Sequence, residues 1–238
     1  MPLEMENRLR PLIALALVAL MAVPLHPAFA GPLTGKIICV DSGHPSETSA
    51  GTRGKRITEN KANWLVALKL KAILRSMGAR VVLTKTSENE KVTNRRRAEI
   101  ANAAKATLMV RLHCDCAGGP GIAVYYPDRK GTRFGVTGPS ASVISRSRAA
   151  AKAFYPSVTA ALKGKIKPKG LRGDSATYIG SKQGALTGSI FSKVPVFTVE
   201  MVTMTHKSDD DFIASAAGQL AMAKAIATAL GAAVKALK

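Results

Sequence analysis

Short apolar runs bounded by turn residues recur along the chain from residue 36 onward. Runs of this kind predict buried strands, and they occupy residues 36–41, 80–85, 108–112, 121–126 and 195–200. Between them, apolar side chains recur at intervals of three and four residues, which is typical of amphipathic helices. The chain therefore alternates between strands and helices.

The helices are predicted from the apolar spacing and from the polar residues that precede it. Thr58 and Thr93 are suitable N-caps, and the apolar stripe that follows Thr58 ends at Gly78. Ser142 to Lys163 predicts a helix bent at Pro156. From Asp209 onward, one long closing helix is expected, since its apolar positions continue to Val234 without interruption.

This alternation predicts a single-domain, three-layer α/β fold, in which a mostly parallel or mixed twisted sheet has helices on both faces. In such sheets the ligand crevice lies beyond the carboxyl ends of the strands. Residues at those ends are therefore the first candidates for function.

The first thirty residues have the pattern of a secretory signal peptide. Arg8 and Arg10 precede an apolar run over residues 11–23, and Ala28-Phe-Ala30 matches a cleavage site. An uncleaved membrane anchor is the weaker alternative, because the run is shorter than the roughly 20 residues that a spanning helix needs. We expect residues 31–238 to form one exported domain, with no later stretch able to span a bilayer.

The chain is strongly basic, with a formal net charge of +20. The predicted signal peptide contributes nothing to this charge, since Arg8 and Arg10 balance Glu4 and Glu6. A basic surface favours a polyanionic partner. Export makes anionic wall polymers or lipids better candidates than nucleic acid, although the charges could also only keep the surface soluble. The basic residues concentrate at 95–97 and at Lys163, Lys165, Lys167, Lys169 and Arg172.

The candidate functional residues lie at the predicted carboxyl edge of the sheet. His44, His113 and Glu200 each follow or end a predicted strand, and Glu59 opens the first helix. Two histidines and a glutamate are a common ligand set for catalytic zinc, which keeps a further position for water. His44, Glu59 and His113 are thus the expected zinc ligands, and Glu200 is the candidate for proton transfer.

Each of these residues also has a purely structural interpretation. His44 could be a hydrogen-bonded loop residue, and Glu59 could complement the helix dipole. His113 could be a core histidine, with Cys114 and Cys116 as rival ligands, although strand alternation turns both cysteines away from its face. Glu200 follows an apolar run, so its carboxylate must be paired, protonated or functional. The three cysteines do not form a disulfide scaffold.

Taken in order, five fragments resemble zinc-dependent N-acetylmuramoyl-L-alanine amidases over residues 36–230. They are residues 40–44 (Val-Asp-Ser-Gly-His), Glu59-Asn60, Arg97 with Ala101-Asn102, Leu112-His113-Cys114, and Val199-Glu200. The resemblance implies that His44, Glu59 and His113 bind Zn²⁺ and that Glu200 is catalytic. It also implies cleavage of the amide between the lactyl group of N-acetylmuramic acid and L-alanine.

Four positions depart from the pattern of that family. Pro45 replaces a glycine, Lys85 an arginine, Arg111 a serine and His206 an asparagine. The four residues of the expected chemistry are retained. We expect these changes to affect substrate detail rather than metal binding, and His206 could enter the site as a substrate contact.

The resulting hypothesis is a monomeric peptidoglycan hydrolase of the periplasm, or secreted to the cell wall, acting on peptidoglycan and held to anionic wall polymers by its basic surface. Neither nucleic acid nor, after signal cleavage, a membrane span is expected. Two alternatives stay open: a zinc peptidase that cuts within the stem peptide, and a wall-binding protein without turnover.

Overall fold

A computed structural model describes residues 31–237, so the predicted signal peptide lies outside the described residues. Eight strands are found in this part of the chain. They are β1 (Ile37–Ser42), β2 (Arg80–Leu83), β3 (Leu108–Asp115), β4 (Ile122–Tyr126), β5 (Gly131–Arg133), β6 (Val136–Gly138), β7 (Pro168–Gly173) and β8 (Val196–Thr203).

Six of these strands form one mixed sheet in the order β2-β1-β3-β8-β4-β7. The first four in this order run parallel. β4 is antiparallel to β8, and β7 is parallel to β4. β5 and β6 form a separate hairpin. The carboxyl ends of β1, β3 and β8 therefore meet at one edge of the sheet, as predicted.

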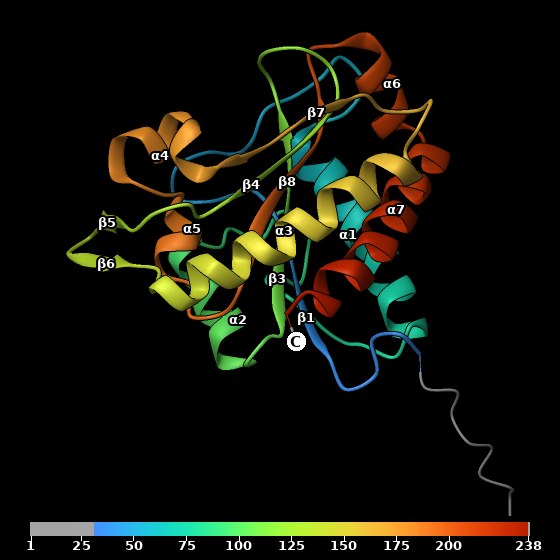
Figure 1. The fold of residues 1–238 in the computed structure, drawn as a ribbon. Coiled ribbons are helices and arrows are strands. Elements are labelled where there is room, and N and C mark those ends of the chain that lie inside the picture. The colour runs from blue at the N-terminus through green and yellow to red at the C-terminus, as the bar shows by residue number, and fades with distance from the viewer. Residues whose placement is uncertain (1–30, 238) are drawn as a thin grey trace, which may run out of the picture.

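Helices cover both faces of the sheet (Figure 1). They are α1 (Glu59–Ser76), α2 (Asn94–Ala103), α3 (Ala141–Ala161), α4 (Tyr178–Gln183), α5 (Thr187–Ile190), α6 (Lys207–Ala214) and α7 (Ala216–Lys235), with a short 3-10 turn, η1 (Asp174–Ala176). α7 lies between α1 and α3 on one face, whereas α2 and α5 contact each other on the other. The predicted three-layer α/β fold is confirmed.

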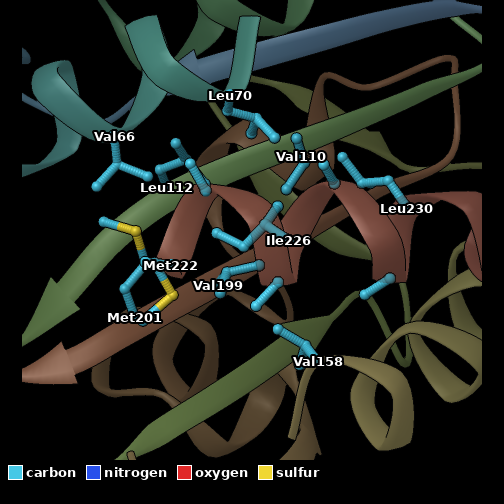
Figure 2. Packing of buried hydrophobic residues seen from close by; sticks show 14 of the residues in the cluster. Val66, Leu70, Val110, Leu112, Val158, Val199, Met201, Met222, Ile226 and Leu230 are labelled. Carbon is cyan, nitrogen blue, oxygen red and sulfur yellow. The ribbon is translucent and has the colours of Figure 1, made fainter. Parts of the chain in front are cut away.

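The main core lies between the sheet and the layer of α1, α7 and α3 (Figure 2). Alternate side chains of β3 and β8, including Val110, Leu112 and Val199, face Ile226 and Leu230 of α7 in this core. A smaller cluster around Met109 and Val196 fills the opposite face. Further along β3 and β8, the side chains on this opposite face are polar. They include His113 and Glu200, so the candidate site residues lie on this face.

The structure differs from the predicted elements in three ways. β3 and β8 continue past His113 and Glu200, so these residues lie within the strands rather than at their carboxyl ends. The closing helix is broken at Ser215 into α6 and α7. β5, β6, β7, α4 and α5 had no clear apolar pattern and were not predicted.

One expectation about membranes concerns the chain after residue 30, in which the sequence predicts no stretch able to span a bilayer. Among the described helices, α7 is long and apolar enough to match a membrane span by length and composition, and 61% of that window is buried inside the protein. Its apolar residues pack against α1, α3 and the sheet. α7 is thus a core helix of this domain, and its burial explains its apolar composition.

Candidate metal centre

Four separate segments deliver side chains to the carboxyl edge of the sheet. His44 follows β1 by two residues, and Glu59 is the first residue of α1. His113 of β3 is directly in register with Glu200 of β8. In-register residues of neighbouring strands point to the same side of a sheet, so His113 and Glu200 share a face.

His44, Glu59 and His113 come together as a group that could hold a metal ion. One ligand atom from each lies within 4.8 Å of the others. Glu59 Oε1 lies 3.2 Å from His44 Nε2 and 3.2 Å from His113 Nδ1. The two imidazole rings are nearly perpendicular, with centroids 5.0 Å apart. Two imidazoles around one carboxylate fit the donor set of a catalytic zinc centre.

The carboxylate of Glu59 is fixed by backbone donors as well as by the imidazoles. Thr52 N donates to Oε2 at 2.8 Å, and Cys114 N donates to Oε1 at 3.0 Å. Burial alone would raise the pKa of Glu59, but hydrogen bonds from His113 and His44 hold this pKa below its ordinary value. The side chain is therefore ionised, as metal binding requires.

The backbone around His44 holds its ring in a defined orientation. His44 has a φ of 60°, which is uncommon outside glycine. Lys85 Nζ donates to the His44 carbonyl and, at 2.8 Å, to Asn60 Oδ1 beside Glu59. His44 Nδ1 lies 3.2 Å from the carbonyl oxygen of Ser49 and can donate to it. A neutral His44 donates either from Nδ1 to Ser49 or from Nε2 to Glu59, and the first tautomer leaves the Nε2 lone pair available to a metal ion.

His113 is packed against the turn that follows β1. A Cβ atom at Gly43 would lie 2.5 Å from His113 Nε2, so only glycine fits there. Burial lowers the pKa of His113 to about 4, which keeps the imidazole neutral and able to bind a metal at neutral pH. His113 Nε2 is buried without a hydrogen-bond partner. A core histidine would normally be satisfied, which supports the ligand interpretation.

The two neighbouring cysteines do not join this group. Cys114 Sγ is buried 3.6 Å from Asn63 Oδ1, on the side of the main core. Cys116 is exposed beyond the end of β3. The alternation of side chains along β3 therefore correctly predicted that Cys114 faces away from His113.

Glu200 forms no ion pair within residues 31–237. Its Oε2 atom is buried without a hydrogen-bond partner. Burial first, and then the negative charges of Glu59 and Asp115, raise the pKa of Glu200 well above its ordinary value. A buried carboxyl group whose pKa is raised in this way is a candidate for proton transfer.

A buried network below the centre had not been predicted. Asp41 accepts from Arg97 Nη1 at 2.7 Å and from Arg111 Nε at 2.8 Å. Burial opposes ionisation of Asp41, but the two guanidiniums hold its pKa well below its usual range. Charged residues inside apolar strands were the available signal, since Asp41 and Arg111 interrupt β1 and β3. Arg111, which stands where the family pattern has serine, is thus a second ion-pair partner of Asp41.

His206 does not point into the centre. Its Nε2 lies 2.8 Å from the carbonyl oxygen of Gly118, to which it can donate. This bond joins the turn between β8 and α6 to the loop after β3. Its use as a substrate contact stays a prediction, and the structure gives it a bridging position instead.

Comparisons with known proteins agree with this architecture. The chain is similar in structure to the N-acetylmuramyl-L-alanine amidase Ami1 of Mycobacterium smegmatis, with a TM-score of 0.72, 20% identity, and 85% and 98% of the two chains covered. It is also similar to the amidase AmiC2 of Nostoc punctiforme, with a TM-score of 0.66, 24% identity, and 83% and 96% covered. At these identities the likeness shows a shared fold.

The sequence itself gives the assignment. No curated protein matches the chain. A family model described as N-acetylmuramoyl-L-alanine amidase, in contrast, matches residues 38–232. This range contains the whole sheet except the first residue of β1, and it includes His44, Glu59, His113 and Glu200. Because the match covers most of the chain, the protein belongs to the N-acetylmuramoyl-L-alanine amidase family.

Proposed function

We propose that this protein is a zinc-dependent peptidoglycan amidase in which His44, Glu59 and His113 hold the metal and Glu200 transfers protons. The substrate bond is the amide between N-acetylmuramic acid and L-alanine of the stem peptide. The observation that carries the proposal is the convergence of both imidazoles on Glu59 Oε1, at 3.2 Å each, with the unpartnered Glu200 carboxyl on the same face as His113.

The roles follow from the chemistry of the residues. When bound, zinc polarises a carbonyl oxygen and lowers the pKa of a coordinated water to about 7. Glu59 and the two imidazoles would hold the ion. Glu200 would take a proton from the attacking water and deliver it to the leaving nitrogen of L-alanine. Its raised pKa suits both steps, because the carboxyl must accept and then release a proton at similar pH.

The setting of this activity is also a proposal. Residues 1–30 have the pattern of a signal peptide, and cleavage after Ala30 would leave residues 31–238 as the catalytic domain. The substrate is a cell-wall polymer, which is consistent with export to the periplasm or the cell surface. The basic surface would supplement the active site in holding anionic wall polymers.

The proposal is tested by metal analysis and muropeptide digestion with the wild type, Glu200→Gln and His113→Ala. We expect Glu200→Gln to retain zinc and lose turnover by a factor of 10² or more, which is within the usual range for a general base. His113→Ala should lose both. Free N-terminal L-alanine in the wild-type products would distinguish an amidase from a peptidase acting within the stem. Full turnover by Glu200→Gln would contradict the assigned role.

A further inference from the structure

A second feature lies beside the metal centre and takes no part in the chemistry described above. It is a cavity of about 730 Å³ between the loop over residues 53–56 and the start of α6. Its lining combines four basic side chains, Arg53, Lys55, Arg56 and Lys207, with Met204, Thr205, Asp210 and Asp211. Pockets for small ligands have volumes of about 300–1,000 Å³, so this one could accept a short peptide segment.

The cavity is lined by segments that are adjacent in the chain to those of the metal centre. Thr52 N donates to Glu59 Oε2, and Gly51 approaches so closely that a Cβ there would lie 3.0 Å from the ring of His44. Arg53 follows immediately, and consecutive Cα atoms are about 3.8 Å apart. On the other side, Met204 and Thr205 directly follow β8, the strand that carries Glu200. Both segments that lead away from the centre therefore continue into the lining of the cavity.

The loop that forms the cavity wall is held in place from both ends. Its base is tied to α1 by the bond of Thr52 to Glu59, and Arg53 pairs with Thr58 across the loop. At its tip, Asp210 Oδ2 accepts from Lys55 N at 2.9 Å and from Arg56 N at 3.0 Å. A wall fixed in this way loses little entropy when a ligand binds.

The charges of the cavity are unbalanced toward the positive side. Asp210 Oδ2 accepts from the two backbone donors, while its Oδ1 has no hydrogen-bond partner among residues 31–237, and Asp211 pairs with both Arg56 and Lys207. The lining thus holds four cationic side chains against two carboxylates. Arg53 and Lys55 are exposed, and within residues 31–237 neither has a carboxylate partner. Two free cations beside a preformed cavity favour a ligand that carries carboxylates.

We propose that this cavity is the subsite for the carboxylate-bearing part of the peptide leaving group. The inference rests on the proposed amidase function. In the uncleaved substrate the lactyl carboxyl of muramic acid is tied up in the scissile amide, so the carboxylates along the chain from this bond belong to the stem peptide. Hydrolysis then frees the lactyl carboxylate on the glycan side and an ammonium group on L-alanine. In an extended chain, a carboxylate two to four residues from the cleaved bond lies roughly 7–14 Å away. The basic cavity therefore complements the peptide side of the substrate and not the glycan side.

Calorimetric binding of a product-like peptide tests this subsite. The probe is a tetrapeptide that begins with L-alanine and has free side-chain and C-terminal carboxylates, compared with the same peptide fully amidated. We expect the wild type to prefer the acidic form by about tenfold, which two partly exposed ion pairs can supply. Arg53→Gln/Lys55→Gln should lose this preference. The control Arg75→Gln/Lys152→Gln removes the same charge from exposed positions on α1 and α3 and should keep it.

The outcomes separate this inference from the proposed function. A preference that is absent from the wild type, or that survives in Arg53→Gln/Lys55→Gln, would overturn the subsite even if muropeptides are cleaved. A preference present in a protein that cleaves no muropeptide would overturn the amidase function and leave the acidic-peptide site standing. If both hold, the KM for muropeptides should rise in the double variant while kcat changes little, because Arg53 and Lys55 lie outside the metal centre.

Discussion

At the scale of single residues, the candidate metal centre depends on charges that are buried together. Asp41 is fully buried between Arg97 and Arg111, and Arg97 also donates to the carbonyl oxygens of Ser42 and Pro45 on either side of His44. The network therefore supports the turn that positions a proposed zinc ligand. Removing the single anion would leave two guanidiniums without compensation, which is a costly arrangement.

Asp41→Asn should accordingly reduce the free energy of unfolding by about 3–5 kcal/mol at neutral pH. The folded-state pKa of Asp41 lies below its unfolded value of about 3.9. Its contribution is thus fully present above that value and is lost as the pH falls toward the folded-state pKa. Urea unfolding of both proteins at pH 7 and pH 3 should show the difference shrinking at the lower pH.

A control for this substitution is available on the surface of α2. Glu99 pairs with Arg95 at 2.8 Å, and both side chains are largely exposed. Glu99→Gln should change stability by at most about 1 kcal/mol. If Asp41→Asn is no more destabilising than Glu99→Gln, the buried network does not support the fold.

At the scale of elements, prediction from the sequence succeeded where one physical signal dominated. The strands under the centre are short apolar runs, and Thr58 and Thr93 cap α1 and α2 as expected, accepting from Lys61 N and Arg96 N. β7 could not be predicted in this way, since Pro168–Gly173 is a basic edge strand with two glycines. Its pairing with β4 is set by tertiary structure.

The break between α6 and α7 was missed because apolar spacing does not register a cap. The period continues through residue 215, but Ser215 is extended and its hydroxyl accepts from Gly218 N at 2.9 Å. Gly218 is also required, since a Cβ there would lie 1.8 Å from the carbonyl oxygen of Phe212. The break leaves α6 free to place Asp210 against the loop over residues 53–56.

A graded series at this break tests the role of the cap. Ser215→Ala should lower the stability by about 1 kcal/mol, and Ser215→Gly by only a few tenths. Gly218→Ala should cost more than either, because its methyl group meets backbone that must move. Chemical denaturation measures all three. Equal stability of Ser215→Ala and the wild type would mean that the cap contributes nothing.

At the scale of the whole molecule, the candidate ligands could be predicted from the sequence, whereas the cavity beside them could not. The candidate ligands could be named from the sequence because parallel strands end at one edge, whatever the details of packing. The cavity beside them could not, since it depends on how residues 53–56 meet α6, which are about 150 positions apart in the chain. Long-range contacts of this kind leave no local pattern.

The net charge of +20 predicts that adhesion to the cell wall depends on salt. Exposed lysines at 163, 165 and 167 lie outside the metal centre, around the turn from α3 to β7. If they hold anionic wall polymers, binding must weaken as the Debye length falls from about 10 Å at 0.1 M salt to about 3 Å at 1 M.

Sedimentation with purified sacculi should be measured with Glu200→Gln, so that the polymer is not digested during the assay. The bound fraction should fall with salt, and less steeply after Lys163→Gln/Lys165→Gln/Lys167→Gln, since fewer counterions are then released. Binding that is indifferent to salt in both proteins would show that the wall is held through the active-site cleft alone.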